Sequence, residues 1–105
     1  MWIRAQDKRR YVNSYLLTSI YVQYTPSMQL YEIVATIVTK EYYILGSYLN
    51  NEQAQSVMDD LEKALSGHPC GADNLKSGVF IMPHSEEVEK WLLSKKQSST
   101  LSKEE

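Results

Sequence analysis

The stretch from Tyr42 to Gly67 constrains the fold more than any other part of the chain, because a strand pattern there passes directly into a helical one. Residues 42–49 are rich in tyrosine, isoleucine and leucine, which suits a strand. Asn50 then fits a helix N-cap, and Gln53 follows three residues later, as in a capping box. We therefore predict a strand that ends where an amphipathic helix begins.

The predicted helix has one apolar stripe and one polar side. The stripe recurs at spacings of three and four residues, which is typical of a helix that packs on a sheet, and consists of Ala54, Val57, Met58, Leu61, Ala64 and Leu65. We expect the acidic residues Asp59, Asp60 and Glu62 on the polar side. Gly67 suits the left-handed position that ends many helices.

Further strands are predicted over residues 2–5, 10–13, 15–24, 30–38 and 78–82, with the first two paired as a hairpin and the last at a sheet edge. Gly46 indicates a bulge or a close neighbour within its strand, and we expect that neighbour to be the following helix. A second, short helix starts at Ser85. The predicted class is α+β, an antiparallel sheet of about four to five strands with one amphipathic helix packed on a face and a short C-terminal helix.

The chain has 105 residues, and we predict one domain over residues 1–94 and a flexible polar tail over residues 95–105. The only cysteine, Cys70, excludes an intramolecular disulfide and leaves a redox role open. No apolar run reaches the length of a signal peptide or a membrane span. We therefore expect a cytoplasmic protein with no membrane partner.

The net charge of −2 is unevenly distributed. Residues 1–13 sum to +3 and the remainder to −5, because the N-terminal part contains Arg4, Lys8, Arg9, Arg10 and Asp7. This basic corner suits an acidic partner, although a solvated turn accounts for the same charges. The acidic remainder disfavours nucleic acid, since phosphate contacts supply much of that affinity.

All eight tyrosines lie between Tyr11 and Tyr48, within the predicted strands. Strands favour tyrosine, but tyrosine is also a frequent contact residue in interfaces. The candidates for an exposed contact patch are Tyr15, Tyr21, Tyr43 and Tyr48. Aromatic side chains on a sheet can also stack on single-stranded nucleic acid, which is a third interpretation.

No catalytic or metal-binding set can be assembled from the sequence. His68, Cys70 and His84 fall short of the roughly four ligands of a zinc site, and a cysteine nucleophile needs a base and an orienting group. The four glycines are too scattered for a phosphate loop. We expect neither enzymatic activity nor a cofactor.

Trp91 and Leu92 belong to a narrow apolar stripe on the predicted second helix. They either dock on the domain or mediate self-association, so a homo-oligomer is a further expectation.

Three blocks of sequence resemble a group of small, mostly uncharacterised proteins of Gram-positive bacteria, their phages and mobile elements. The blocks are Met-Trp-Ile-Arg-Ala-Gln-Asp-Lys at the start, Ile-Leu-Gly-Ser-Tyr at 44–48 and Asn-Asn-Glu-Gln-Ala-Gln-Ser-Val-Met-Asp-Asp-Leu at 50–61. The group tends to open Met-[Trp/Arg]-Ile-Arg-Ser-Gln-[Asp/Asn]-Lys and to contain a Leu-Gly-x-Tyr strand, and Ala5 here replaces its usual serine. The resemblance implies a bacterial or phage context and supplies no catalytic residues.

The leading hypothesis is a non-enzymatic module that binds a protein partner through the basic corner and the exposed tyrosines. The alternative is a phage- or element-encoded inhibitor of a host nuclease, of the anti-CRISPR kind. Its acidic surface of Asp59, Asp60 and Glu62 would then occupy a nucleic-acid groove.

Overall fold

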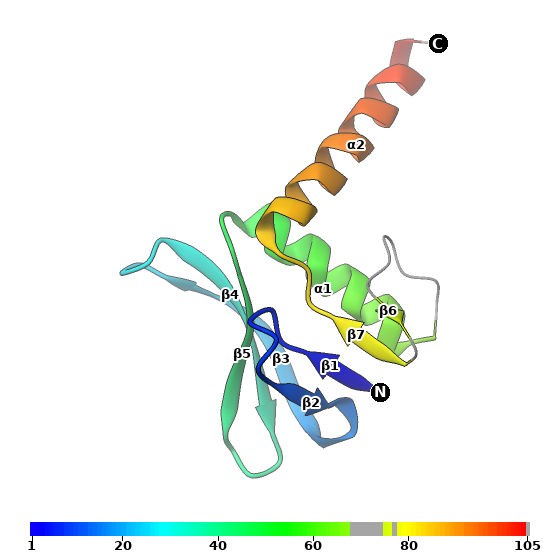
Figure 1. The fold of residues 1–105 in the computed structure, drawn as a ribbon. Coiled ribbons are helices and arrows are strands. Elements are labelled where there is room, and N and C mark those ends of the chain that lie inside the picture. Colours follow the sequence, from blue (N-terminus) through cyan, green and yellow to red (C-terminus); the bar gives the residue numbers. More distant parts are fainter. Residues whose placement is uncertain (68–74, 77, 105) are drawn as a thin grey trace.

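The computed structural model shows an α+β fold with two β-sheets and two α-helices (Figure 1), and it describes residues 1–67, 75–76 and 78–104. In chain order its elements are β1 (Trp2–Arg4), β2 (Tyr11–Asn13), the 3-10 helix η1 (Ser14–Leu16), β3 (Leu17–Thr25), β4 (Leu30–Ile37), β5 (Tyr42–Tyr48), α1 (Asn51–Leu65), β6 (Leu75–Lys76), β7 (Val79–Ile81) and α2 (Ser85–Glu104).

The strands divide between two sheets, whereas the sequence analysis predicted one. The first sheet has the order β2-β1-β7-β6 and the second the order β3-β4-β5. The predicted hairpin of β1 and β2 is present, and β3, β4 and β5 are antiparallel neighbours. β7 lies between β1 and β6 and runs parallel to β1, so its predicted place at a sheet edge is wrong. A parallel pair needs a long crossover connection, and almost the whole domain separates these two strands in sequence.

Helix α1 has the predicted caps and packs on β4 and β5. The Asn50 side chain accepts a hydrogen bond from the Gln53 backbone N–H at 2.8 Å. The Gln53 side chain accepts from the N–H of Leu49, one residue before the expected Asn50, at 3.2 Å. Gly67 follows the helix with a φ of +77°, which is the left-handed conformation predicted for it. Four residues of the apolar stripe are buried in the core, namely Ala54, Val57, Leu61 and Ala64.

Helix α2 has 20 residues and is longer than the short helix predicted. It includes residues 95–104, whose flexibility stays a prediction. Val88 is buried, and Trp91 and Leu92 are half-buried against the core. Figure 1 shows that the C-terminal part of α2 extends away from both sheets. Docking of its first turns therefore holds this helix on the domain.

Gln6 joins the two sheets. Its backbone N–H donates to the Leu45 carbonyl at 2.7 Å. Its side-chain oxygen accepts from the Ser47 N–H at 2.9 Å, and its side-chain nitrogen donates to the carbonyls of Ser47 at 3.3 Å and Pro83 at 3.0 Å. Because one side chain bonds to β5 and to the segment between β7 and α2, it fixes the first sheet relative to the second.

A bulge at Leu45 turns Tyr48 into the core. Ile33 of β4 pairs with Gly46, whereas Val34 pairs with Ile44, so Leu45 is the extra residue of β5. One extra residue reverses the face on which every later side chain of a strand lies. Tyr48 is consequently fully buried, and its hydroxyl donates to the Pro83 carbonyl at 2.8 Å. The prediction that Tyr48 is an exposed contact residue is wrong for this reason.

Gly46 makes room for the Tyr48 ring, whereas the sequence analysis predicted α1 as its close neighbour. A Cβ atom at position 46 would lie 2.9 Å from the Tyr48 hydroxyl oxygen and 3.1 Å from its ring carbon Cε2. Tyr48 is fully buried, and protein interiors leave little room for a side chain to shift. We therefore expect Gly46→Ala to lower the free energy of unfolding by about 1–3 kcal/mol. Urea unfolding of the variant measures this change.

Tyr48→Phe tests the source of this penalty, because it removes the Tyr48 hydroxyl oxygen, the atom that lies nearest to a Cβ atom at position 46. We expect the penalty of Gly46→Ala to be smaller in the double variant, as for two residues in contact. Equal penalties in both backgrounds would place the clash elsewhere.

The buried hydroxyl of Tyr48 also predicts sensitivity to alkali. Burial raises the pKa of Tyr48 above its ordinary value, and the negative charge of Glu87 adds to the effect. The folded state therefore favours the neutral phenol, whose stabilising contribution is complete below about pH 10 and is lost as the pH rises further. We expect the free energy of unfolding to fall more steeply above about pH 10 in the wild type than in Tyr48→Phe. Identical pH profiles in urea unfolding would contradict this.

Candidate functional site: an aromatic and basic groove

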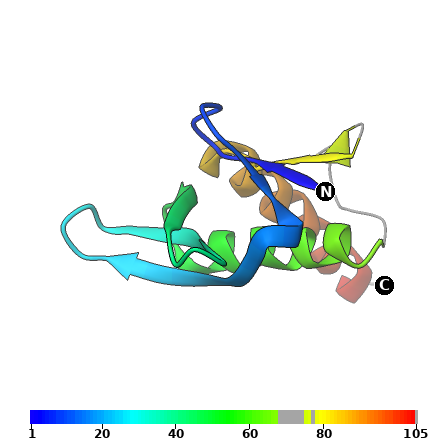
Figure 2. The same cartoon turned by 90° about the horizontal axis from the view of Figure 1, so that it is seen from below.

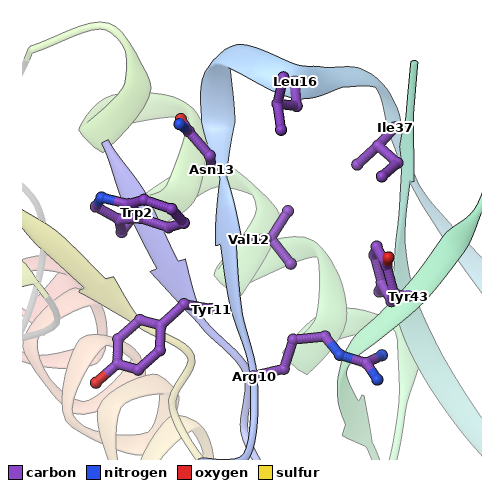
Figure 3. A pocket seen from close by; sticks show the side chains of 8 residues that line it. All are labelled: Trp2, Arg10, Tyr11, Val12, Asn13, Leu16, Ile37 and Tyr43. Atoms are coloured by element: carbon purple, nitrogen blue, oxygen red, sulfur yellow. The ribbon is translucent and has the colours of Figure 1, made fainter. Parts of the chain in front are cut away.

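A groove of about 270 Å³ opens between the β1–β2 hairpin and the second sheet (Figure 3). We call it the hairpin groove. Its lining combines aromatic, arginine and aliphatic side chains, namely Trp2, Arg10, Tyr11, Val12, Asn13, Leu16, Ile37 and Tyr43. The groove thus brings together residues from the start of the chain and from β4 and β5.

The alternation of the hairpin strands places Trp2 and Tyr11 on the open face of the first sheet. Ile3 pairs with Val12, and both are buried in the core. Their chain neighbours Trp2 and Tyr11 point to the opposite face, because successive side chains of a strand alternate. Trp2 is 49% exposed and Tyr11 52% exposed. Two large rings are therefore half accessible at one side of the groove.

Arg10 and Tyr43 face each other at the opposite side of the groove, as Figure 3 shows. The guanidinium carbon lies 4.3 Å from the centre of the Tyr43 ring, which is a cation–π contact. The Tyr43 hydroxyl donates to Glu41 Oε2 at 2.6 Å. This hydrogen bond raises the pKa of Tyr43, while the positive charge of Arg10 opposes the increase. The cation–π contact holds the Arg10 side chain beside the groove, where its N–H groups can donate to a bound acidic group.

A second hollow of about 350 Å³ adjoins the groove and is lined by Trp2, Tyr11 and Val79. Arg4 lies on this side, with its guanidinium carbon 5.4 Å from the centre of the Tyr11 ring. Its buried Nε atom has no hydrogen-bond partner among the described residues. The two hollows share Trp2 and Tyr11, so they form a continuous surface with an arginine stacked on a tyrosine at each side.

Of the basic residues and tyrosines predicted as contacts, the structure brings Arg4, Arg10 and Tyr43 to this surface. Five others lie elsewhere. Lys8 and Arg9 are exposed in the turn of the hairpin, Tyr15 is exposed on η1, Tyr21 is exposed on β3 and Tyr48 is buried.

Trp2 and Tyr11 were missed by the sequence analysis. Their alternation with Ile3 and Val12 was the available signal, since a hairpin with those two residues in the core must expose the two aromatic neighbours.

The acidic surface predicted on α1 is smaller than expected. Asp60 is only 1% exposed, because it lies three residues after Val57 and four before Ala64, on the buried side of the helix. Asp59 and Glu62 are exposed as predicted. The nuclease-inhibitor hypothesis therefore retains two of its three acidic contact residues.

Neither a metal-ligand cluster nor a membrane-spanning helix is found among the described residues. Within residues 1–67, 75–76 and 78–104, no group of three or more His, Cys, Asp and Glu side chains could hold a metal ion. His68 and Cys70 lie outside the described residues, and His84 is exposed. Across the same described ranges, no helix combines the length and the apolar character needed to cross a bilayer.

Comparisons with known proteins give no match to a protein-family model, a curated protein or a solved structure. The fold and the groove define a small α+β protein with an aromatic and basic surface.

Proposed function

We propose that this protein is a non-enzymatic binding module that holds an acidic segment of a partner protein in the hairpin groove. One observation carries the proposal: tryptophan, tyrosine and arginine, the residue types that dominate binding hot spots, gather around one hollow. Trp2 and Tyr11 are half accessible, so a partner can still bury much of each ring. Burial of such rings is a main source of affinity in protein interfaces.

The charge of the hairpin supports an acidic partner. Residues 1–13 sum to +3, and Arg4 and Arg10 lie on the two sides of the aromatic surface. A planar guanidinium binds a carboxylate through two parallel hydrogen bonds. Because each arginine is already stacked on a tyrosine, less conformational entropy is lost when it binds.

The floor of the groove indicates what accompanies the carboxylates. Leu16 and Ile37 contribute aliphatic surface to the lining, and Val12, which is only 4% exposed, lies at its base. The groove of about 270 Å³ continues into the hollow of about 350 Å³ beside it, so the surface is extended enough for a protein segment. The groove therefore suits a protein segment with an apolar anchor residue and flanking aspartate or glutamate.

Arg9 and Arg10 provide a matched pair of variants. Both side chains are exposed, but only Arg10 lines the groove and stacks on Tyr43. The immobilised protein is incubated with a Gram-positive bacterial lysate, and the captured proteins are quantified by mass spectrometry. We expect Arg10→Ala to lose a protein that the wild type and Arg9→Ala both retain, because the two variants remove the same charge and differ in the groove contact.

Circular dichroism of both arginine variants confirms that each remains folded. An equal loss of capture in Arg9→Ala and Arg10→Ala would show that the general charge of the hairpin, and not the groove, governs binding, and full capture by both would contradict the proposed site.

Single-stranded nucleic acid is a second candidate ligand, favoured by the stacked Arg10 and Tyr43 and by the exposed ring of Trp2. The net charge of −5 outside residues 1–13 opposes it. Titration of a fluorescent single-stranded oligonucleotide at rising salt separates the two ligands. Oligonucleotide binding that weakens with salt and is lost in Arg10→Ala would favour this second candidate.

A further inference from the structure

β3 is a long, uncharged edge strand, and its register irregularity lies near its start, between Leu17 and Ser19. It forms one border of the second sheet and, among the described residues, pairs with β4 alone. Its nine residues, Leu-Thr-Ser-Ile-Tyr-Val-Gln-Tyr-Thr, include no charged residue and no proline. Natural edge strands are commonly short, charged or interrupted by proline, because free N–H and C=O groups invite another strand.

The other border of the second sheet is protected. Gln6 occupies the free side of β5, where its side chain exchanges hydrogen bonds with both backbone groups of Ser47. The border strands of the first sheet are short, with three residues in β2 and two in β6. β3 is therefore the most accessible long edge among the described strands.

The composition of β3 indicates that a second copy of the same strand fits it. In an antiparallel pair centred on Tyr21, Ile20 of one copy lies opposite Val22 of the other, and Ser19 lies opposite Gln23. β-Branched residues pair well across strands, and no like charges meet within this strand pair. The register irregularity falls at Thr18, directly before Ser19, so positions 19–23 themselves pair with β4 in regular register.

We propose that two copies of this chain associate through β3, antiparallel and about a twofold axis at Tyr21, to form one continuous sheet. The hollow of about 400 Å³ beside β3 supports this arrangement, because it is lined by Ile20 and by the apolar Met58 and Leu65 of α1. The partner's Ile20 and Val22 extend the apolar face next to this hollow. Asp59 and Glu62 also line it and oppose association, so added salt is expected to strengthen the dimer.

Charge substitutions at Tyr21 test the dimer and its axis together. Tyr21 is 43% exposed, so lysine or glutamate is tolerated in the single chain. At the twofold axis, Tyr21→Lys places two lysines opposite each other, and Tyr21→Glu places two glutamates there. We expect either variant to weaken the dimer about tenfold or more, and an equimolar mixture of the two to recover it as a heterodimer.

Sedimentation equilibrium of the full chain measures these dimer constants, and Tyr15→Lys is the control because Tyr15 is 85% exposed and lies outside β3. Circular dichroism identifies a variant that has unfolded. A wild type that stays monomeric up to its solubility limit would overturn the proposal, as would a folded Tyr21→Lys variant that dimerises normally or a mixture that does not recover. The association is independent of the hairpin groove, so a failure here leaves the proposed partner site standing.

Discussion

Tyr48→Ala is expected to lower the free energy of unfolding by about 3–5 kcal/mol, the range for removing a large buried aromatic ring. Tyr48 is fully buried within the core, and its hydroxyl bonds to the Pro83 carbonyl. Removal of the Tyr48 ring leaves a cavity between β5 and the segment that leads into α2. Since small domains are typically stable by about 5–15 kcal/mol, this single change removes much of the margin. Urea unfolding followed by circular dichroism measures the effect.

Two other tyrosine variants make the Tyr48 result specific. Tyr48→Phe retains the ring and removes one hydrogen bond, so we expect a loss of about 1 kcal/mol. Tyr15→Ala removes a ring that is 85% exposed and should change the stability by less than about 0.5 kcal/mol. If Tyr48→Ala were as stable as Tyr15→Ala, the bulge at Leu45 and the burial of Tyr48 would both be contradicted, and Tyr48 would again be a candidate contact residue.

Trp2→Ala is expected to weaken partner binding by about 30-fold or more, the effect of losing a hot-spot tryptophan worth at least about 2 kcal/mol. Trp2 lines both hollows of the contact surface and is 49% exposed in the free protein. A partner that covers the groove must therefore bury this ring. Titration of the captured partner by isothermal calorimetry gives the dissociation constants.

Tyr42→Ala is the control for the tryptophan variant, because Tyr42 is 66% exposed and lies next to Tyr43 in sequence but does not line the groove. We expect this variant to bind as the wild type does. Equal losses in the two variants, with both proteins folded, would show that binding depends on exposed aromatic side chains in general and not on the groove.

The local parts of the fold could be predicted from the sequence because their signals lie within a few residues. The Asn50 cap, the buried stripe of α1, the left-handed Gly67 and the β1–β2 hairpin all depend on short-range patterns. The division into two sheets depends on the pairing of β1 with β7, whose residues are separated by most of the chain. No periodicity within either strand specifies that partner.

Side-chain placement was predicted less well, for two physical reasons. A one-residue bulge at Leu45 changes the face on which Tyr48 lies, and its only signal in the sequence is the ambiguous Gly46. Asp60 was assigned to the polar side by its charge, although its helical position is on the buried side of α1. In both cases the chemical type of the residue suggested exposure and the geometry of the element decided burial.

The candidate site was predicted in part. The charge pattern predicted Arg4 and Arg10 as contact residues, and the tyrosine content predicted Tyr43. Arg10 and Tyr43 come close to Trp2 and Tyr11 only because the hairpin packs beside β5. The hydrogen bonds of Gln6 to Leu45 and Ser47 hold the hairpin in that place. Figure 2 shows the hairpin and the second sheet from below, as separate layers of strands. A site formed between two sheets has no contiguous sequence motif.

Site-specific photocross-linking tests the central claim most directly, because it can be carried out before the partner has been identified. A photoreactive phenylalanine analogue is placed at position 11, in the groove, or at position 42 as an exposed control. Each protein is irradiated in a Gram-positive bacterial lysate, and the adducts are identified by mass spectrometry. The proposed function predicts a discrete protein adduct from position 11 and none of that identity from position 42. No adduct at position 11, or the same adducts from both positions, would contradict it.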